Sequence, residues 1–177
     1  MLSLSSVRYC RVYNNPEDTT DSNGVPPKSF EAVIDGGVAE EIAEVINKNT
    51  PIAIKNYGTT TVSIVEDGLS KDVYYTPVSP VVVDIYVDVY LTEDYENPSS
   101  EEWLAIVNEV ETSVINYLNN INPGEDLIDT RVAATVVTDV ESVYYAEIGF
   151  PFNQIESVAY NEKATSTPSK IGVSLRT

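Results

Sequence analysis

The longest regular pattern of apolar residues runs from residue 80 to residue 124 and predicts a strand followed by a helix. From residue 81 to residue 91 every odd-numbered residue is aliphatic, whereas four of the five even-numbered residues are Asp or Tyr. Side chains of a strand alternate between its two faces. This segment should therefore have one apolar face and one face of tyrosines and carboxylates.

The residues that follow predict a long amphipathic helix. Ser99 and Glu102 match a capping box, in which two side chains satisfy backbone N–H groups at the helix start. Apolar residues then recur every three or four positions over about six turns: Trp103, Ile106, Val107, Val110, Val114, Tyr117, Leu118 and Ile121. Pro123 and Gly124 end the pattern. We expect this helix to pack on the odd-numbered face of the strand, since both elements must bury an apolar side.

The rest of the chain mixes short strands and helices, which predicts the α+β class. Strands are predicted near residues 4–14, 30–34, 142–149 and 170–175, a helix at 38–49, and a hairpin at 59–66 and 71–76 around Asp67-Gly68. Residues 129–138 combine helical spacing with many β-branched residues, and we favour a short helix. Residues 151–169 are predicted to be mostly loop, with one possible short strand near 155–159.

The segment Val78-Ser79-Pro80 is the expected boundary between two small α+β units. Residues 1–78 would form an N-terminal domain of strands, one helix and a hairpin. Residues 79–177 would form a C-terminal domain in which a strand, a long helix, a short helix and further strands follow one another, with a helix packed on a sheet.

Charge limits the partners that this chain can bind. The 177 residues include 28 acidic and 10 basic side chains, a net charge of −18. This charge opposes binding to nucleic acid, which is a polyanion. No apolar run approaches the 18 residues of a membrane span, so we expect no membrane insertion. The single cysteine, Cys10, should be a small buried hydrophobe.

Residue types also limit the chemistry. The chain has no histidine, which removes Ser-His-Asp and Cys-His nucleophiles and the common zinc sites. The acidic stretch Glu17–Gly24 is similar to a calcium loop in composition, but Thr19 and Phe30 would occupy the first and last ligand positions. We therefore expect a solvated turn there. Asp35-Gly36-Gly37 favours a tight strand-to-helix turn over an anion site. We expect no enzyme, no metal and no cofactor.

The less apolar face of the 81–91 strand is the candidate interface, with Asp84, Tyr86, Asp88 and Tyr90. Two carboxylates four residues apart on a strand lie roughly 13 Å apart, which is too far for a glycosidase pair. Tyrosine covers a large contact area at low entropy cost, so the twelve tyrosines suit a protein interface or stacking on sugars.

An ordered series of short motifs resembles the C-terminal part of the baseplate J-like proteins of contractile phage tails. The series begins with Val12-Tyr13-Asn14-Asn15-Pro16 and Asp21-Ser22-Asn23-Gly24-Val25-Pro26-Pro27-Lys28-Ser29. It continues with the Gly36-Gly37 turn before Glu40-Glu41-Ile42-Ala43-Glu44-Val45-Ile46, and then with Tyr57-Gly58-Thr59-Thr60-Thr61-Val62. The strand at 81–92, the long helix, Pro123-Gly124-Glu125-Asp126-Leu127, Val140-Glu141-Ser142-Val143 and Asn161-Glu162-Lys163-Ala164 complete it.

The resemblance implies a structural role without catalytic residues. Such a protein is made in the bacterial cytoplasm and assembles into the wedge or ring of a virion tail baseplate or a phage-tail-like particle. Its expected partners are other baseplate proteins and copies of itself. The alternative is a carbohydrate- or receptor-binding tail module that uses exposed tyrosines and carboxylates.

Overall fold

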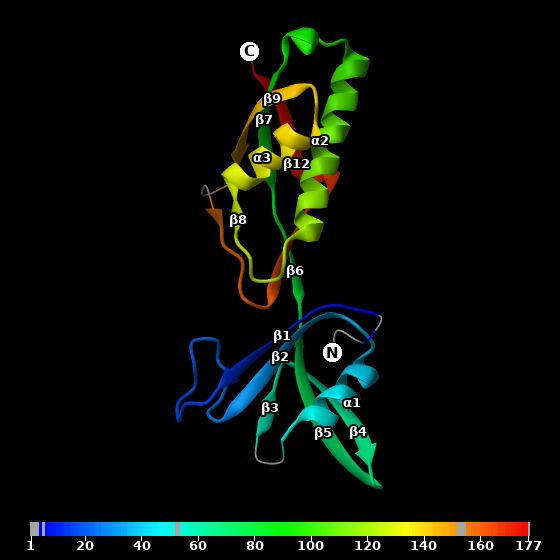
Figure 1. The fold of residues 1–177 in the computed structure, drawn as a ribbon, viewed down its shortest axis with the longest axis vertical. Helices are drawn as coiled ribbons and strands as arrows, with labels where there is room; N and C mark the ends of the chain where they lie inside the picture. The colour runs from blue at the N-terminus through cyan, green and yellow to red at the C-terminus, as the bar shows by residue number, and fades with distance from the viewer. Residues whose placement is uncertain (1–3, 5, 52–53, 152–154, 177) are drawn as a thin grey trace. The chain divides into compact units, whose positions relative to one another are not determined.

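The computed structural model describes residues 4, 6–51, 54–151 and 155–176 (Figure 1). The chain divides into two compact units, residues 1–79 and 80–177, and each has its own hydrophobic core. The division falls one residue after the boundary expected from the sequence. Both units combine helices with strands, so the predicted α+β class is confirmed.

The N-terminal unit is a mixed sheet with one helix packed on it. The sheet has the order β1-β2-β5-β4, and β3 and β5 pair in parallel with successive parts of β2. The strand bounds are β1 (Val7–Asn15), β2 (Ser29–Gly36), β3 (Lys55–Tyr57), β4 (Thr60–Glu66) and β5 (Leu69–Pro77). The predicted hairpin of β4 and β5 is confirmed; Asp67 and Gly68 both have positive φ, which a two-residue type I′ turn requires.

Helix α1 (Ala39–Asn49) covers one face of this sheet and buries Ile42, Ala43 and Ile46 there. The predicted tight turn between β2 and α1 is confirmed. Gly37 has a φ of 95°, and a Cβ at this position would lie 2.8 Å from the Cδ1 atom of Ile42. Only glycine fits here, because both the conformation and the space exclude a side chain.

The C-terminal unit is a three-stranded sheet of order β12-β7-β9 with two helices on one face (Figure 1). The central strand β7 (Ile85–Leu91) pairs antiparallel with β9 (Val143–Gly149) and parallel with β12 (Ile171–Arg176). The helices are α2 (Ser100–Asn120) and α3 (Asp129–Asp139). The helical interpretation of residues 129–138 is therefore confirmed.

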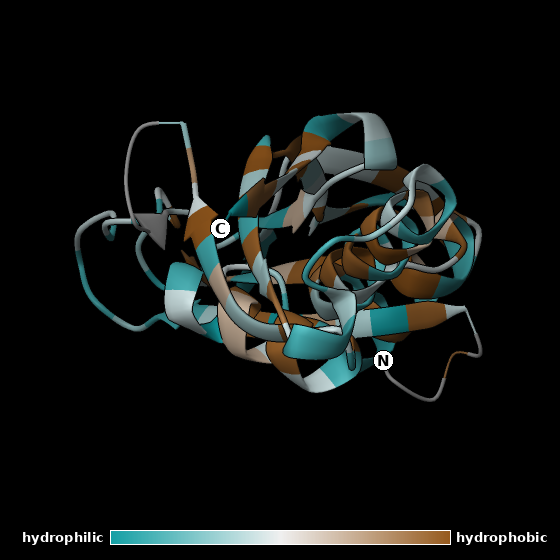
Figure 2. Ribbon diagram, turned by 90° about the horizontal axis from the view of Figure 1, so that it is seen from above, coloured by the Kyte–Doolittle hydropathy of each residue, from teal (hydrophilic) through white to brown (hydrophobic). Residues whose placement is uncertain are grey.

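The predicted packing of α2 on the odd-numbered face of the central strand is also confirmed. One core joins β7 to both helices, and its members include Ile85, Val87, Val89, Leu91, Ile106, Val110, Val114, Leu118, Val132 and Val136. Figure 2 shows the bands of apolar and polar residues that alternate along helices and strands. Asp84 and Asp88 are partly exposed, as the predicted register requires.

The prediction of one unbroken strand over residues 81–91 is wrong. Two strands occupy this region, β6 (Ser79–Val82) and β7, with Val83 and Asp84 between them. β6 pairs with β11 (Glu162–Thr165), whereas β7 pairs with β9 and β12. The alternation continues across the break because Val83 is also buried. Hydrophobic periodicity indicates which face a residue occupies, but it does not indicate where the chain changes its partner strand.

The strand predictions did not include three short strands of the structure, β3, β8 (Leu127–Ile128) and β11. β3 and β11 have three and four residues, and β8 pairs antiparallel with β10 (Ile155–Glu156). β10 lies within the possible strand near 155–159, but β11 falls in the predicted loop. Only Ala164 of β11 is apolar. A four-residue strand with one small apolar side chain leaves almost no periodic signal.

The predicted capping box of α2 is confirmed. The Ser99 N–H donates to Oε2 of Glu102 at 2.8 Å, and the Glu102 N–H donates to Oγ of Ser99 at 3.3 Å. The hydrogen bonds to Ser99 hold the pKa of the Glu102 carboxyl below its ordinary value, the backbone bond most of all. The charged form of Glu102 is therefore favoured in the folded protein.

We expect Glu102→Gln to lower the melting temperature at pH 7 and to have no effect in acid. A carboxyl with a depressed folded pKa stabilises above its unfolded pKa, about 4.3 for Glu, and loses that contribution as pH falls through the folded value. Thermal melts of both proteins from pH 7 to pH 2 check this. Glu101→Gln, in the same first turn but outside the capping box, is the control. An equal effect of both variants at pH 7 would contradict a specific role of the box.

Candidate interface on the C-terminal sheet

The side of β12-β7-β9 that faces away from α2 and α3 carries tyrosines and charged residues. Strand pairing arranges them in three rows: Gly172, Tyr86 and Gly149; Ser174, Asp88 and Glu147; and Arg176, Tyr90 and Tyr145. We call this surface the tyrosine face and define it by Tyr86, Asp88, Tyr90, Tyr144, Tyr145, Glu147 and Arg176. It brings together residues from three strands that are far apart in the sequence.

Tyr86 stands between two glycines, one on each neighbouring strand. A Cβ at Gly172 would lie 3.3 Å from Cδ1 of the Tyr86 ring, and a Cβ at Gly149 would lie 3.7 Å from the Cβ of Tyr86. The ring therefore lies over bare backbone on the Gly172 side, and it is 55% exposed. Its large aromatic surface is available to another molecule.

Three tyrosines cluster at the other end of this face. The ring centroids of Tyr90 and Tyr145 are 5.3 Å apart, and those of Tyr90 and Tyr144 are 6.4 Å apart in an edge-to-face arrangement. The register of β9 against β7 shifts here, between Tyr90 and Leu91. Because of this bulge, Tyr144 and Tyr145 are both exposed although they are adjacent in a strand.

The charged residues of the tyrosine face form hydrogen bonds with other residues of the same face. Nη2 of Arg176 donates to Oδ2 of Asp88 at 2.7 Å, and this hydrogen bond, with the charge of Asp88, raises the pKa of Arg176. The Tyr145 hydroxyl donates to Oε1 of Glu147 at 3.3 Å. The negative charge of Glu147 is the main cause of a raised pKa of Tyr145, which therefore stays neutral at physiological pH.

The structure places all four residues of the candidate interface at this strand. Tyr86, Asp88 and Tyr90 lie on the tyrosine face, with Tyr86 exposed and Tyr90 half-buried by its tyrosine neighbours. Asp84 lies just before β7 and forms an ion pair of 3.0 Å with Lys170. Both aspartates are thus engaged with basic partners from the C-terminal end of the chain.

Sequence reasoning missed Tyr144, Tyr145, Glu147 and Arg176 as members of the same surface. Their strands were predicted, but strand order and direction were not. The available signal was the pair of alternating segments 142–149 and 170–175, each with one polar side. Which of these sides joins the tyrosines of β7 depends on the parallel pairing of β12 and on the bulge in β9.

Among the hollows of the described part of the chain, two border the tyrosine face and each includes a single tyrosine. One is lined by Leu91, Thr92, Glu93, Glu96 and Tyr144. The other is lined by Asp129, Thr130, Ala133, Tyr145, Ala146, Glu147 and Ile148. The tyrosines are thus spread over an open sheet surface and do not surround one of these hollows.

The stretch that is similar to a calcium loop folds as a turn closed by its own carboxylate. Oδ1 of Asp21 accepts hydrogen bonds from the N–H groups of Asn23 and Val25, both at 2.9 Å. Within the described part of the chain, no group of three or more His, Cys, Asp or Glu side chains is placed to hold a metal ion. No described helix is both long and apolar enough to cross a membrane.

Comparison with known proteins adds no relative to this description. A scan against protein-family models found no match, and neither did a search of curated proteins.

Proposed function

We propose that this chain is a structural subunit of a phage or phage-tail-like baseplate and acts through protein–protein contacts made by the tyrosine face. The exposed, tyrosine-rich side of a sheet whose other side packs against α2 and α3 is the observation that carries the proposal. The ordered motifs that resemble baseplate J-like proteins supply the class of assembly.

Two properties of the tyrosine face suit protein contact. The rings of Tyr90, Tyr144 and Tyr145 are already positioned by one another, so these side chains lose little entropy on binding. The charged residues already have partners within the face: Arg176 forms an ion pair with Asp88, and Glu147 accepts a hydrogen bond from the Tyr145 hydroxyl, which leaves the charge of Glu147 for a basic group of the partner. A partner that covers this surface would leave few polar groups unsatisfied.

Charge indicates the chemistry of the partner. The C-terminal unit carries 17 acidic and 4 basic residues, and the N-terminal unit carries 11 and 6. A second acidic surface would be repelled, whereas a basic one would be attracted over the Debye length of about 8 Å at physiological salt. We therefore expect this face to bind a baseplate protein with a basic patch and to contribute little to self-association of the isolated chain.

The alternative of a carbohydrate- or receptor-binding module has less support. Sugar sites usually gather several aromatic and polar side chains in one concave pocket. Here the hollows beside the tyrosine face hold one tyrosine each. A broad, open surface favours protein contact over sugar binding.

Affinity capture from a lysate of particle-producing cells tests the proposal. The tagged chain should recover baseplate proteins, identified by mass spectrometry, and recovery by Tyr86→Ala and Tyr145→Ala should fall by about tenfold or more, since buried interface tyrosines often contribute about 2 kcal/mol or more. Electron microscopy of particles labelled on this subunit should place the label at the tail baseplate.

The matched control is Tyr95→Ala, which removes an exposed tyrosine outside the sheet, in the 3₁₀ turn Glu93–Tyr95. It should bind as the unmutated chain does. If the unmutated chain recovers no tail protein, the assembly role is wrong. If recovery survives both face variants undiminished, the tyrosine face is not the interface.

A further inference from the structure

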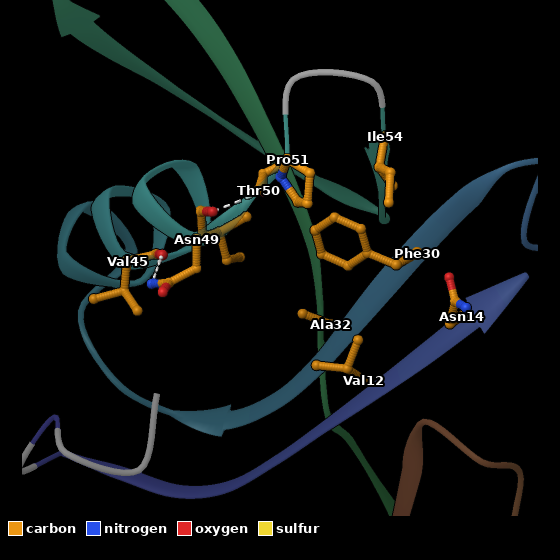
Figure 3. Close-up of a pocket in the computed structure, with 10 residues that line it drawn as sticks. Val12, Asn14, Phe30, Ala32, Val45, Asn49, Thr50, Pro51 and Ile54 are labelled. Atoms are coloured by element: carbon orange, nitrogen blue, oxygen red, sulfur yellow. Dashed lines mark hydrogen bonds between the residues drawn. The ribbon is translucent and has the colours of Figure 1, made fainter.

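An apolar groove opens in the N-terminal unit where the end of α1 passes over β1 and β2. Its volume is about 420 Å³, and it is lined by Val12, Asn14, Phe30, Ala32, Val45, Ile46, Asn49, Thr50, Pro51 and Ile54. Figure 3 shows Phe30, Pro51 and Ile54 gathered on one side, with Val12, Asn14 and Ala32 along the two strands. Since a cavity of about 150 Å³ accepts a group of benzene size, this groove has room for aliphatic side chains.

Part of the groove lining remains exposed although it lies on the core side of the sheet. Val12 is 57% exposed, yet it pairs with Ala32, which is fully buried. The side-chain amide of Asn49, at the rim of the groove, donates a hydrogen bond to the Val45 carbonyl at 2.7 Å. This polar group therefore already has a partner within α1. The exposed surface that remains is mainly aliphatic.

The same unit carries an apolar knob at the tip of the β4–β5 hairpin. Val65 and Leu69 are 76% and 73% exposed, the highest values among the exposed large hydrophobic residues of the described chain. In the hairpin register Leu69 pairs with Glu66, and Val65 pairs with Ser70, so the two apolar side chains project from opposite faces of the ribbon.

We propose that the hairpin tip of one copy of this chain inserts into the groove of a second copy. The tip residues do not line the groove of their own chain, and their exposure shows that they are not buried in it. Apart from Val38, every exposed large hydrophobic residue described in this unit belongs to the tip or to the groove: Val12, Ile54, Val65 and Leu69.

Charge complementarity supports a second copy as the occupant. The tip carries two exposed acidic residues, Glu66 and Asp67. The exposed charged residues that adjoin groove residues in the chain are mostly basic: Arg11, Lys48 and Lys55, against the single acid Glu44. An acidic knob and a groove flanked mostly by basic residues attract each other, although the whole chain is strongly acidic.

A knob and a groove at different places on one molecule produce a head-to-tail contact. Such contacts close into rings when the rotation between copies permits, and otherwise extend into filaments. This inference concerns the N-terminal unit and goes beyond the proposed function, because it does not involve the tyrosine face. The contact area of one hairpin tip is small, so we expect weak association of isolated copies.

Sedimentation equilibrium of mixed variants tests the head-to-tail contact. At about 0.15 M salt, where surface repulsion is partly screened, the unmutated chain should associate as its concentration rises toward about 1 mM. The tip variant Val65→Ser/Leu69→Ser and the groove variant Val12→Asp should each associate at least tenfold more weakly. An equimolar mixture should form dimers and nothing larger, because one intact tip meets one intact groove.

Two control variants test whether the association is specific to the tip and the groove. Val38→Ser removes an exposed apolar residue elsewhere in the unit, and Tyr86→Ala alters the tyrosine face; both should associate as the unmutated chain does. Thermal melts verify that every variant is folded. A monomeric unmutated chain, a tip variant that associates normally, or a mixture that stays monomeric would overturn the proposal.

Cysteine pairing gives a second measurement that detects brief contacts. In a Cys10→Ala background, a Leu69→Cys chain mixed with a Val12→Cys chain should form mixed disulfide dimers under mild oxidation, well above the level reached with Val38→Cys in place of Val12→Cys. Mixed dimers at the level of that control would contradict insertion of the tip into the groove.

Discussion

Replacing Leu118 by alanine should lower the free energy of unfolding of the C-terminal unit by about 2–5 kcal/mol. Leu118 is 2% exposed and belongs to the core that joins α2 to β7. Removing its branched end takes buried apolar surface away and leaves a cavity that a close-packed core fills only partly. Urea unfolding followed by the fluorescence of Trp103, which lies on the same helix, measures the change in this unit.

The matched control is Leu104→Ala, the same substitution at an exposed position of α2. Leu104 is 61% exposed, so its truncation should change the unfolding free energy by less than about 0.5 kcal/mol. Equal effects of the two substitutions would mean that α2 does not bury Leu118 in solution.

Leu118 belongs to the apolar pattern that predicts the buried side of α2, whereas Leu104 lies outside that pattern. The same reasoning correctly assigned Ile85 and Val87 to the core and Asp88 to the opposite side. Capping and turn residues were equally informative, since Ser99, Gly37 and Gly68 each meet a local requirement of the backbone. Local rules and periodicity therefore predicted most helices and strands.

Most of the tyrosine face could not be predicted in this way. Tyr145 and Arg176 lie 55 and 86 residues from Tyr90, and they join it only through the pairing of β9 and β12 with β7. Strand order depends on the balance of many tertiary contacts, which a single sequence does not display. The bulge that exposes Tyr144 next to Tyr145 also breaks the period of two on which face assignments rest.

The groove shows a related limit. Val12 and Cys10 lie two positions apart in β1 and therefore share a face of this strand, and both pair with buried residues of β2. Cys10 is half-buried against the core, and burial raises the pKa of its thiol. Val12 lies in the groove and remains exposed. Sequence periodicity predicts which face a side chain occupies, whereas the length and placement of α1 decide whether that face is covered.

A buried polar group of the N-terminal unit leads to the second large effect. Glu31 lies in β2 and is 1% exposed, and the Thr76 hydroxyl of β5 donates a hydrogen bond to its Oε1 atom. The same hydroxyl accepts a hydrogen bond from the Thr59 N–H at 3.2 Å. Thr76 thus links β2 to β5 and holds the start of the hairpin against them.

We expect Thr76→Val to destabilise the N-terminal unit by about 1–3 kcal/mol. Valine keeps the shape of threonine but supplies neither the donor to Glu31 nor the acceptor for the Thr59 N–H, and the carboxyl group remains in a site with almost no access to water. Thr61→Val, on the exposed side of β4, is the matched control and should change stability by less than about 0.5 kcal/mol. Urea unfolding followed by far-UV circular dichroism measures both. Combining Thr76→Val with Glu31→Leu should recover part of the lost stability, because removing both partners leaves no buried carboxyl group without its hydrogen-bond donor. A double variant that is less stable than Thr76→Val alone would show that the other contacts of Glu31 matter more than this hydrogen bond.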